Sequence, residues 1–347
     1  MNRFKIFTIL TVIGILLLIM GCSNDKTTSS TPDQAESSSK DGKILLKVVH
    51  DVTEDHIKGV GADLFKELVE ERLGDKVEVE VYPNSTLFDV EEGTEALQAG
   101  NVHVVISASS KLVGFDPAYQ LYDVPFLFNT IESFYNFDNG EDGQNLRGKI
   151  ENFDLKILGT WAGSFKQITN SKHPITKPED MKGLKLRVMA GGLLEDQYTQ
   201  LGAGATVIPF SDLYMSLQQG MIDGQENSFL EIATAKIFEV QDYMTITNHA
   251  PTTYPILTNK NFWENELPED VRNELEAILE EVNEGVAAKA KEVEQEALDT
   301  IKNDGDMEIY ELSDDELAAF RDAMQPLYEK YSEVIGEDLI NKALESQ

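Results

Sequence analysis

Cysteine is almost absent from this sequence. Cys22 is the only cysteine among 347 residues, so no disulfide can form within the chain and the fold must be stabilised by its core. Basic residues are also scarce, with 29 Lys and Arg against 62 Asp and Glu and a formal net charge of −33. A chain this acidic has no general field that attracts nucleic acid or an anionic membrane surface. Nucleic acid is therefore not expected as a partner.

Motifs that carry common catalytic chemistry are also missing. The sequence has no P-loop, no GxSxG elbow, no HExxH and no CxxC pair. Gly202-Ala203-Gly204 lacks the third glycine of a dinucleotide fingerprint. His50, Asp51, Asp55 and His56 match no zinc spacing, and a loop after a strand that contacts a ligand explains them better. We therefore predict no enzyme, no cofactor and no metal site, with a carboxylate-based, lipid-anchored hydrolase as an alternative.

The N-terminus has the pattern of an export signal. A basic start is followed by an apolar run over residues 6–20, which is too short for an ordinary membrane-spanning helix. Gly21-Cys22 then looks like a bacterial lipobox. We predict a lipoprotein signal peptide over 1–21 and a lipidated Cys22 that opens a flexible tether over 22–42. The mature protein is expected outside the cytoplasm, anchored to the outer face of the cytoplasmic membrane.

The chain after the tether starts with a β-α-β pattern. Residues 43–50 and 77–82 read as strands, and residues 57–73 between them have helical spacing of apolar side chains. This order is typical of α/β proteins, in which ligands meet the loops at the carboxyl ends of parallel strands.

A second pattern occurs twice. Helical segments ending in Leu-Gln-x-Gly precede short strands at residues 92–103 and again at 213–223, with Leu97 and Leu217 in equivalent places. A glycine just after the helix accounts for the helix stop in both. The repeat indicates two α/β lobes built alike, or a chance similarity of helix ends.

The stretch from Met181 to Asn227 contains the most informative single residue. A strand over 184–188 carries Arg187, one of only six arginines in the chain. A guanidinium binds a carboxylate through two parallel hydrogen bonds, which an ammonium cannot do. Arg187 is either such a clamp or a solvated strand residue. Further along, Ser211 is expected to cap a helix over 212–219.

The C-terminal part contains a long helical pattern. Apolar residues recur at helical spacing from Val271 to Ile301, behind Pro268 and two acidic residues that suit a helix start. We predict a long helix with one buried face.

Four segments together carry a family resemblance: KGLKLRV, LGA, PFSDLYMSLQQGMIDGQEN and FEVQDYMTITNH. In this order they resemble the dicarboxylate-binding (DctP-like) solute-binding proteins of tripartite ATP-independent periplasmic (TRAP) transporters. The resemblance implies a two-lobed, periplasmic-binding-protein-like α/β fold with a hinge, a cleft between the lobes and a long lobe-spanning C-terminal helix. It places one lobe at 43–163 plus about 253–292 and the other at 164–252 plus about 293–347.

The resemblance also implies a ligand site. Lys166 stands where the family commonly has arginine, so this chain would offer an ammonium there. Loops of the first lobe are expected to close over the ligand. The residues expected to bind are Arg187, Asn227, Lys166 and Phe210, with Asp89, Glu91, Ser107 and Ser109 in the closing loops.

The function implied is capture of a small organic acid anion and its delivery to an ion-gradient-driven TRAP permease. A binding protein of an ABC importer or a chemosensor would share the fold and stays an alternative. The sequence does not identify the organic acid, the coupling ion of the permease or the oligomeric state.

Overall fold

The computed structural model describes residues 42–347, which belong to one compact unit of the chain. The predicted signal peptide over 1–21, and Cys22 with nearly all of its tether, lie outside the described residues. Among residues 42–347, no helix combines the length and the apolar character needed to cross a membrane.

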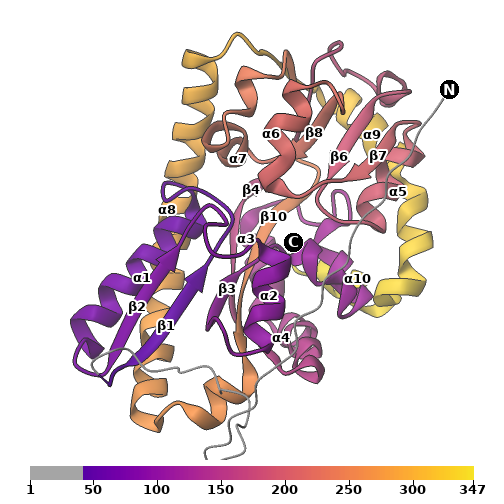
Figure 1. Ribbon diagram of the computed structural model, residues 1–347. Helices are drawn as coiled ribbons and strands as arrows, with labels where there is room; N and C mark the ends of the chain where they lie inside the picture. The colour runs from indigo at the N-terminus through magenta and orange to yellow at the C-terminus, as the bar shows by residue number, and fades with distance from the viewer. Residues whose placement is uncertain (1–41) are drawn as a thin grey trace, which may run out of the picture. The chain divides into compact units, whose positions relative to one another are not determined.

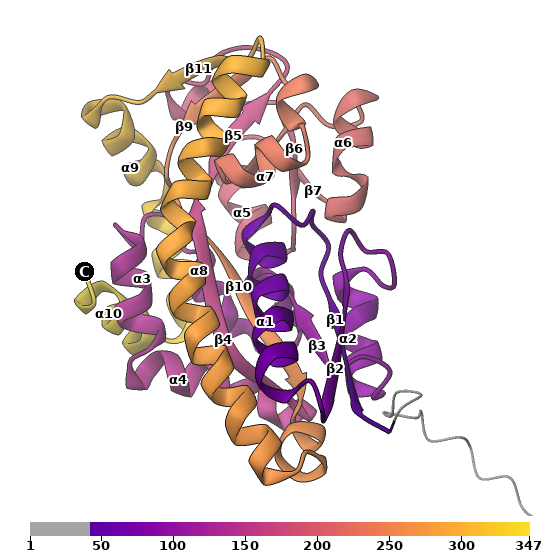
Figure 2. The same ribbon diagram turned by 90° about the vertical axis from the view of Figure 1, so that its left-hand side faces the viewer.

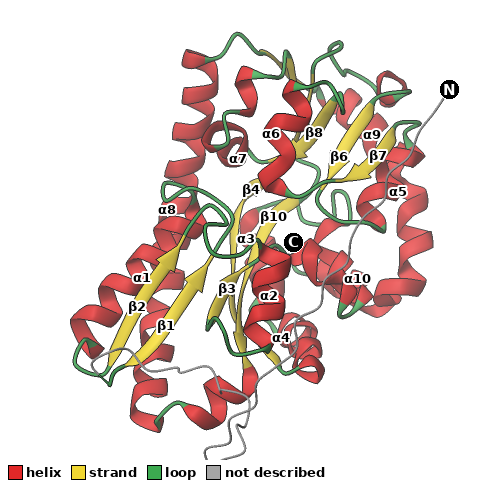
Figure 3. Ribbon diagram, in the orientation of Figure 1, coloured by secondary structure: helices red, strands yellow, loops and turns green. Residues whose placement is uncertain are grey.

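Two mixed β-sheets organise this unit (Figure 3). The first sheet has five strands in the order β2 (Val77–Tyr82), β1 (Ile44–Val49), β3 (Val104–Ile106), β10 (Pro251–Asn259) and β4 (Leu155–Phe165). The second has six, in the order β11 (Glu308–Glu311), β9 (Tyr243–Ile246), β5 (Gln167–Asn170), β8 (Gly224–Asn227), β6 (Lys185–Val188) and β7 (Gly204–Val207).

The chain passes from one sheet to the other with almost no loop. Lys166 alone separates β4 from β5, and residues 247–250 return the chain from β9 to β10. The two crossing segments are joined, since the Lys166 amide donates to the Ala250 carbonyl at 2.8 Å. We call these two segments the crossover. Short, paired connections of this kind are where two sheets can rotate relative to each other.

Ten α-helices of the described chain surround the sheets (Figure 1). They are α1 (Ile57–Leu73), α2 (Val90–Gln98), α3 (Ile131–Asp138), α4 (Glu141–Gly148), α5 (Leu193–Gln200), α6 (Phe210–Gln218), α7 (Phe229–Thr234), α8 (Glu269–Asp304), α9 (Asp314–Tyr331) and α10 (Glu337–Glu345).

Helix α8 links the two sheets. Its 36 residues span roughly 54 Å at 1.5 Å per residue. It contacts α1 and β4 beside the first sheet and α7 beside the second, as its course in Figure 2 shows. Its apolar stripe is buried at the predicted positions, including Val271, Leu275, Ile278, Val282, Val286 and Ile301. The predicted α/β fold with a long spanning helix is confirmed.

Both local patterns read from the sequence occur in the structure. Strands β1 and β2 are parallel around α1. Helices α2 and α6 end at Gln98 and Gln218, and the glycines two residues later have φ of +77° and +67°. Glycine adopts this left-handed geometry without the cost that a Cβ imposes. The strands that follow, β3 and β8, lie in different sheets.

One local prediction was wrong. Ser211 does not cap α6, because the helix begins at Phe210 and no side-chain cap holds its start. Pro209 precedes the helix instead and leaves Ser211 within the first turn. The predicted limits of the two lobes stay a prediction.

A close approach in the first sheet generates a stability prediction. A Cβ added to Gly61 in α1 would lie 2.3 Å from the ring of Trp161. That ring is buried and held by a 2.7 Å hydrogen bond from its Nε1 to Asn283 of α8. Gly61→Ala is therefore expected to lower the free energy of unfolding by about 1–3 kcal/mol, as measured by urea denaturation.

Gly148→Ala is the control, since a Cβ there meets no atom within 4 Å. It is expected to change stability by less than about 0.5 kcal/mol. Equal effects of the two substitutions would contradict the packing argument.

Candidate functional site

Arg187 is buried without a matching charge. Its side chain is 1% exposed, and its Nε donates to the Ile208 carbonyl at 2.8 Å. Its Nη1 has no hydrogen-bond partner in the described chain, and no carboxylate there forms an ion pair with it. Burial lowers the pKa of Arg187 to about 10, although nearby carboxylates oppose this shift. The guanidinium is still a cation at neutral pH, and an unpaired buried cation calls for an anion.

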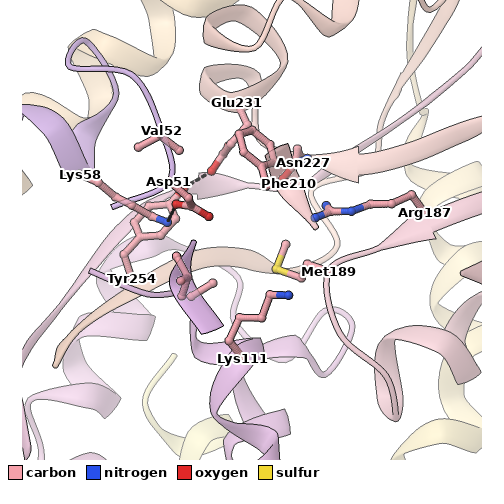
Figure 4. Close-up of a pocket in the computed structure, with 12 residues that line it drawn as sticks. Asp51, Val52, Lys58, Lys111, Arg187, Met189, Phe210, Asn227, Glu231 and Tyr254 are labelled. Carbon is pink, nitrogen blue, oxygen red and sulfur yellow. Dashed lines mark hydrogen bonds and ion pairs between the residues drawn. The ribbon is translucent and has the colours of Figure 1, made fainter. Parts of the chain in front are cut away.

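Arg187 faces a pocket that both sheets line (Figure 4). The first sheet and its helices contribute Asp51, Val52, Lys58, Val90, Ala108, Lys111 and Tyr254, while the second contributes Arg187, Met189, Phe210, Asn227 and Glu231. The pocket has a volume of about 420 Å³ with its mouth included. We call it the main pocket. Pockets of this size and position are where binding proteins hold small ligands.

The main pocket has positive groups on more than one side. Lys58 forms a 2.7 Å ion pair with Asp51 and lies 4.9 Å from the ring centroid of Tyr254. Burial raises the pKa of Asp51, but the charge of Lys58 and its hydrogen bond outweigh this and lower the pKa overall. Lys111 pairs with Glu91 at 2.5 Å, where the carboxylate is largely exposed. Figure 4 shows Lys58 and Arg187 on opposite sides of the pocket.

Glu231 connects α7 to the first sheet behind the pocket. It accepts hydrogen bonds from the hydroxyls of Ser228 and Tyr254 and from Nε2 of His56 at 3.3 Å. His56 Nδ1 accepts from the Lys58 amide, so Nε2 carries the proton that is donated. Burial raises the pKa of Glu231, but these hydrogen bonds outweigh it and lower the pKa to about 2. Glu231 is therefore an ionised, fully satisfied carboxylate.

Apart from Lys166, the site residues predicted from the sequence fall into three groups. Arg187, Asn227 and Phe210 all line the main pocket. Asp89 and Glu91 line an adjoining hollow together with Lys111 and Phe210, and Asp89 caps α2 by accepting from the Glu92 amide at 2.8 Å. Ser107 and Ser109 are buried, and Ser109 Oγ accepts from Thr253 Oγ1 at 2.8 Å.

Lys166 lies in the crossover and lines a different cavity. Its Nζ is 2.7 Å from Asp123 and 3.4 Å from Glu226, and its side chain is 1% exposed. Glu226 also interacts at 2.8 Å with Nε2 of His249, which lies in the second crossing segment. Two carboxylates already match the charge of Lys166. The structure therefore places this ammonium within the crossover, whereas the guanidinium of Arg187 is free to bind.

Sequence reasoning missed several residues of the main pocket. Tyr254 lies in an apolar strand, and its hydroxyl is distinguished only by its partner Glu231. Met189 follows Arg187 by two residues, a spacing that keeps both side chains on one side of an extended chain. That spacing was the available signal for Met189. Lys58 follows the 50–56 loop, for which a ligand-contact role was predicted.

Residues 42–347 contain no group of three or more His, Asp or Glu arranged to hold a metal ion.

Comparison with known proteins identifies the family. Residues 48–334 match DctP, bacterial extracellular solute-binding protein, family 7. The chain belongs to this family.

Proteins that align with most of this chain support the same family assignment. The C4-dicarboxylate-binding periplasmic protein DctP of Rhodobacter capsulatus is 36% identical over 330 residues, covering 94% of this chain and 96% of that protein. The C4-dicarboxylate-binding protein DctB of Bacillus subtilis is 35% identical over 303 residues, covering 87% and 86%. A solved TRAP periplasmic solute-binding protein from Shewanella oneidensis with bound succinate matches with a TM-score of 0.85 and 34% identity, covering 88% of this chain and 99% of that one.

These relatives confirm the predicted class, an extracytoplasmic solute-binding protein of a TRAP transporter. They are transport proteins that bind solutes rather than enzymes.

The buried carboxyl of Glu294, behind Glu231, generates a pH prediction. Its Oε1 accepts from the Phe229 amide at 3.0 Å, while its Oε2 has no partner. Burial and the charge of Glu231 raise its pKa from 4.5 to about 7. In the pH range between these two pKa values, the folded chain therefore binds more protons at Glu294 than the unfolded chain does. The free energy of unfolding falls as the pH rises through this range.

Glu294→Gln keeps the acceptor but cannot ionise. The free energy of unfolding of the variant minus that of the wild type is expected to rise by about 1–3 kcal/mol from pH 4.5 to pH 7.5, measured by denaturation at each pH. Glu292→Gln, an exposed position on the same helix, is the control for the loss of one charge from α8. A difference that does not change with pH would refute the raised pKa.

Proposed function

We propose that this solute-binding protein captures a four-carbon dicarboxylate of the succinate type and delivers it to a TRAP permease. The observation that carries the proposal is the buried guanidinium of Arg187, whose Nη1 is unpaired at the wall of the main pocket. The relatives named for C4-dicarboxylates, at 35% and 36% identity, support this ligand class.

Arg187 holds one carboxylate of the ligand through two hydrogen bonds. Asn227 contributes its amide from the neighbouring strand β8, and Phe210, whose ring centroid is 6.0 Å from the Arg187 guanidinium, forms an apolar wall. The second carboxylate lies among Lys58 and Lys111, which are contributed by the other sheet. A ligand with a charge at each end therefore draws the two sheets together.

Lys166 does not contact the ligand in this arrangement, because it lines the separate cavity and not the main pocket, and two carboxylates hold its ammonium there. Asp89 and Glu91 act at the rim of the closed cleft, where Glu91 positions Lys111. Closure follows from rotation of the two sheets about the crossover. The protein releases its ligand unchanged, and transport draws its energy from an ion gradient through the permease.

A ligand screen by thermal unfolding tests this function. A ligand that binds only the folded chain raises the melting temperature by mass action. Succinate is expected to raise it, and neutral sugars and amino acids are not. Arg187→Ala is expected to weaken succinate binding by about 2–5 kcal/mol, and Arg187→Lys to recover only part of this because the planar fork is lost. Isothermal titration measures the affinities.

Arg72→Ala removes the same charge from the surface of α1, where Arg72 pairs with Glu274 and Glu281. It is the matched control and should bind succinate as the wild type does. Succinate affinity unaffected by Arg187→Ala would exclude the carboxylate clamp.

We also propose that Cys22 carries a lipid that anchors the mature protein to the outer face of the cytoplasmic membrane. This rests on the sequence alone, an apolar run that ends at Gly21-Cys22. Two or more acyl chains anchor a protein stably. Wild-type protein is expected in the membrane fraction of its native host, and Cys22→Ala in the soluble fraction outside the cytoplasm. Identical fractionation of the two, or an unmodified Cys22 by mass spectrometry, would rule out the anchor.

A further inference from the structure

A second cavity adjoins the main pocket on its inner side. It has a volume of about 240 Å³ with its openings included, and we call it the inner cavity. Ala108, Met189, Glu231 and Tyr254 line both spaces, so these four residues form the wall between them. The wall is thin, because a single layer of side chains faces both ways.

Only one of the four wall residues can move aside. Glu231 and Tyr254 are hydrogen-bonded to each other, and Glu231 is also bonded to Ser228 and His56. The side chain of Ala108 is a single methyl group. The thioether of Met189 has no hydrogen-bond partner in the described chain, and methionine is flexible and fits irregular gaps. Figure 4 shows Met189 between Arg187 and Lys111 in the main pocket.

The inner cavity differs in charge from the main pocket. Its charged lining residues are one cation, Lys166, and two carboxylates, Asp123 and Glu231. Lys166 is already paired, 2.7 Å from Asp123. A second carboxylate would therefore meet net negative charge there, at an energy cost that burial increases.

Hydroxyl groups suit the same space. Ser110, Thr252 and Thr253 line it. The hydroxyls of Thr252 and Thr253 already donate to the Ser164 carbonyl and to Ser109 Oγ, and their oxygens can still accept hydrogen bonds. The chemistry of the lining therefore matches an uncharged chain that carries several hydroxyls.

We propose that Met189 is a specificity-determining residue, which closes the inner cavity and confines the ligand to a short acid. Shortening Met189 joins the two cavities. A six-carbon sugar acid with one carboxylate, such as gluconate, then binds with its carboxylate on Arg187 and its hydroxylated tail in the inner cavity. This inference rests on the proposed function, because it assumes that Arg187 holds the ligand carboxylate.

The test compares three variants and three ligands by isothermal titration. Met189→Ala and Met189→Ser open the wall, and Met189→Leu is the control that keeps the volume. The ligands are succinate, gluconate and adipate, the last with six carbons like gluconate but with a carboxylate at each end. In both shortened variants the ratio of gluconate affinity to succinate affinity is expected to rise at least about tenfold. Adipate and the Met189→Leu variant are expected to show no gain.

The outcomes separate this inference from the proposed function. Failure of the wild type to bind succinate counts against the proposed function. Wild-type binding of succinate, with no gain for gluconate in either folded shortened variant, overturns the role of Met189. Equal gains for adipate and gluconate also overturn it, because the inner cavity would then not discriminate by charge. Thermal melting confirms that each variant is folded, and two different truncations keep the test informative if one is unstable.

Discussion

The structure depends on one uncompensated charge, the guanidinium of Arg187. Burying a cation without a paired counter-charge is costly, and the Ile208 carbonyl, the face of Phe210 and more distant carboxylates offset only part of that cost. In the proposed function a ligand carboxylate supplies the missing partner, so binding removes a cost that the empty fold carries. Under the proposed function, the same cost favours closure of the cleft over the ligand, which shields the guanidinium from water.

This local cation works against the charge of the whole chain. A formal net charge of −33 repels an anion at long range. Screening by salt limits that repulsion to distances of about 8–10 Å at ordinary ionic strength. The ligand therefore interacts mainly with the charged groups close to it. Within the main pocket Arg187, Lys58 and Lys111 outnumber Asp51 and Glu231. Recognition of the anion therefore depends on the placement of a few side chains and not on the field of the protein.

The sequence allowed much of the fold, and three of the residues that line the main pocket, to be predicted for physical reasons. The spacing of apolar residues in α8 and the glycines after α2 and α6 are local signals, and local signals survive in a single sequence. Arg187 was recognisable because arginine is rare here. Tyr254 and Glu231 were not recognisable, because what distinguishes them is a hydrogen bond between residues 23 positions apart in the sequence. Lys166 was expected beside the ligand, yet partners from distant segments, Asp123 and Glu226, hold it in the crossover.

The polar groups of the crossover and of the pocket wall are paired to different extents. Lys166 and His249 of the crossover are buried, and each pairs with Glu226 of β8, which suits an axis that stays closed to water while the sheets rotate. At the wall, Glu231 of α7 is hydrogen-bonded to His56 and Tyr254, which belong to the first sheet and its helices. Arg187 lies in the pocket beside that wall, and its Nη1 has no hydrogen-bond partner in the described chain. Opening would leave the paired axis intact and expose Glu231 and Arg187 to water, so the charged groups that hydrate on opening are those that face the ligand.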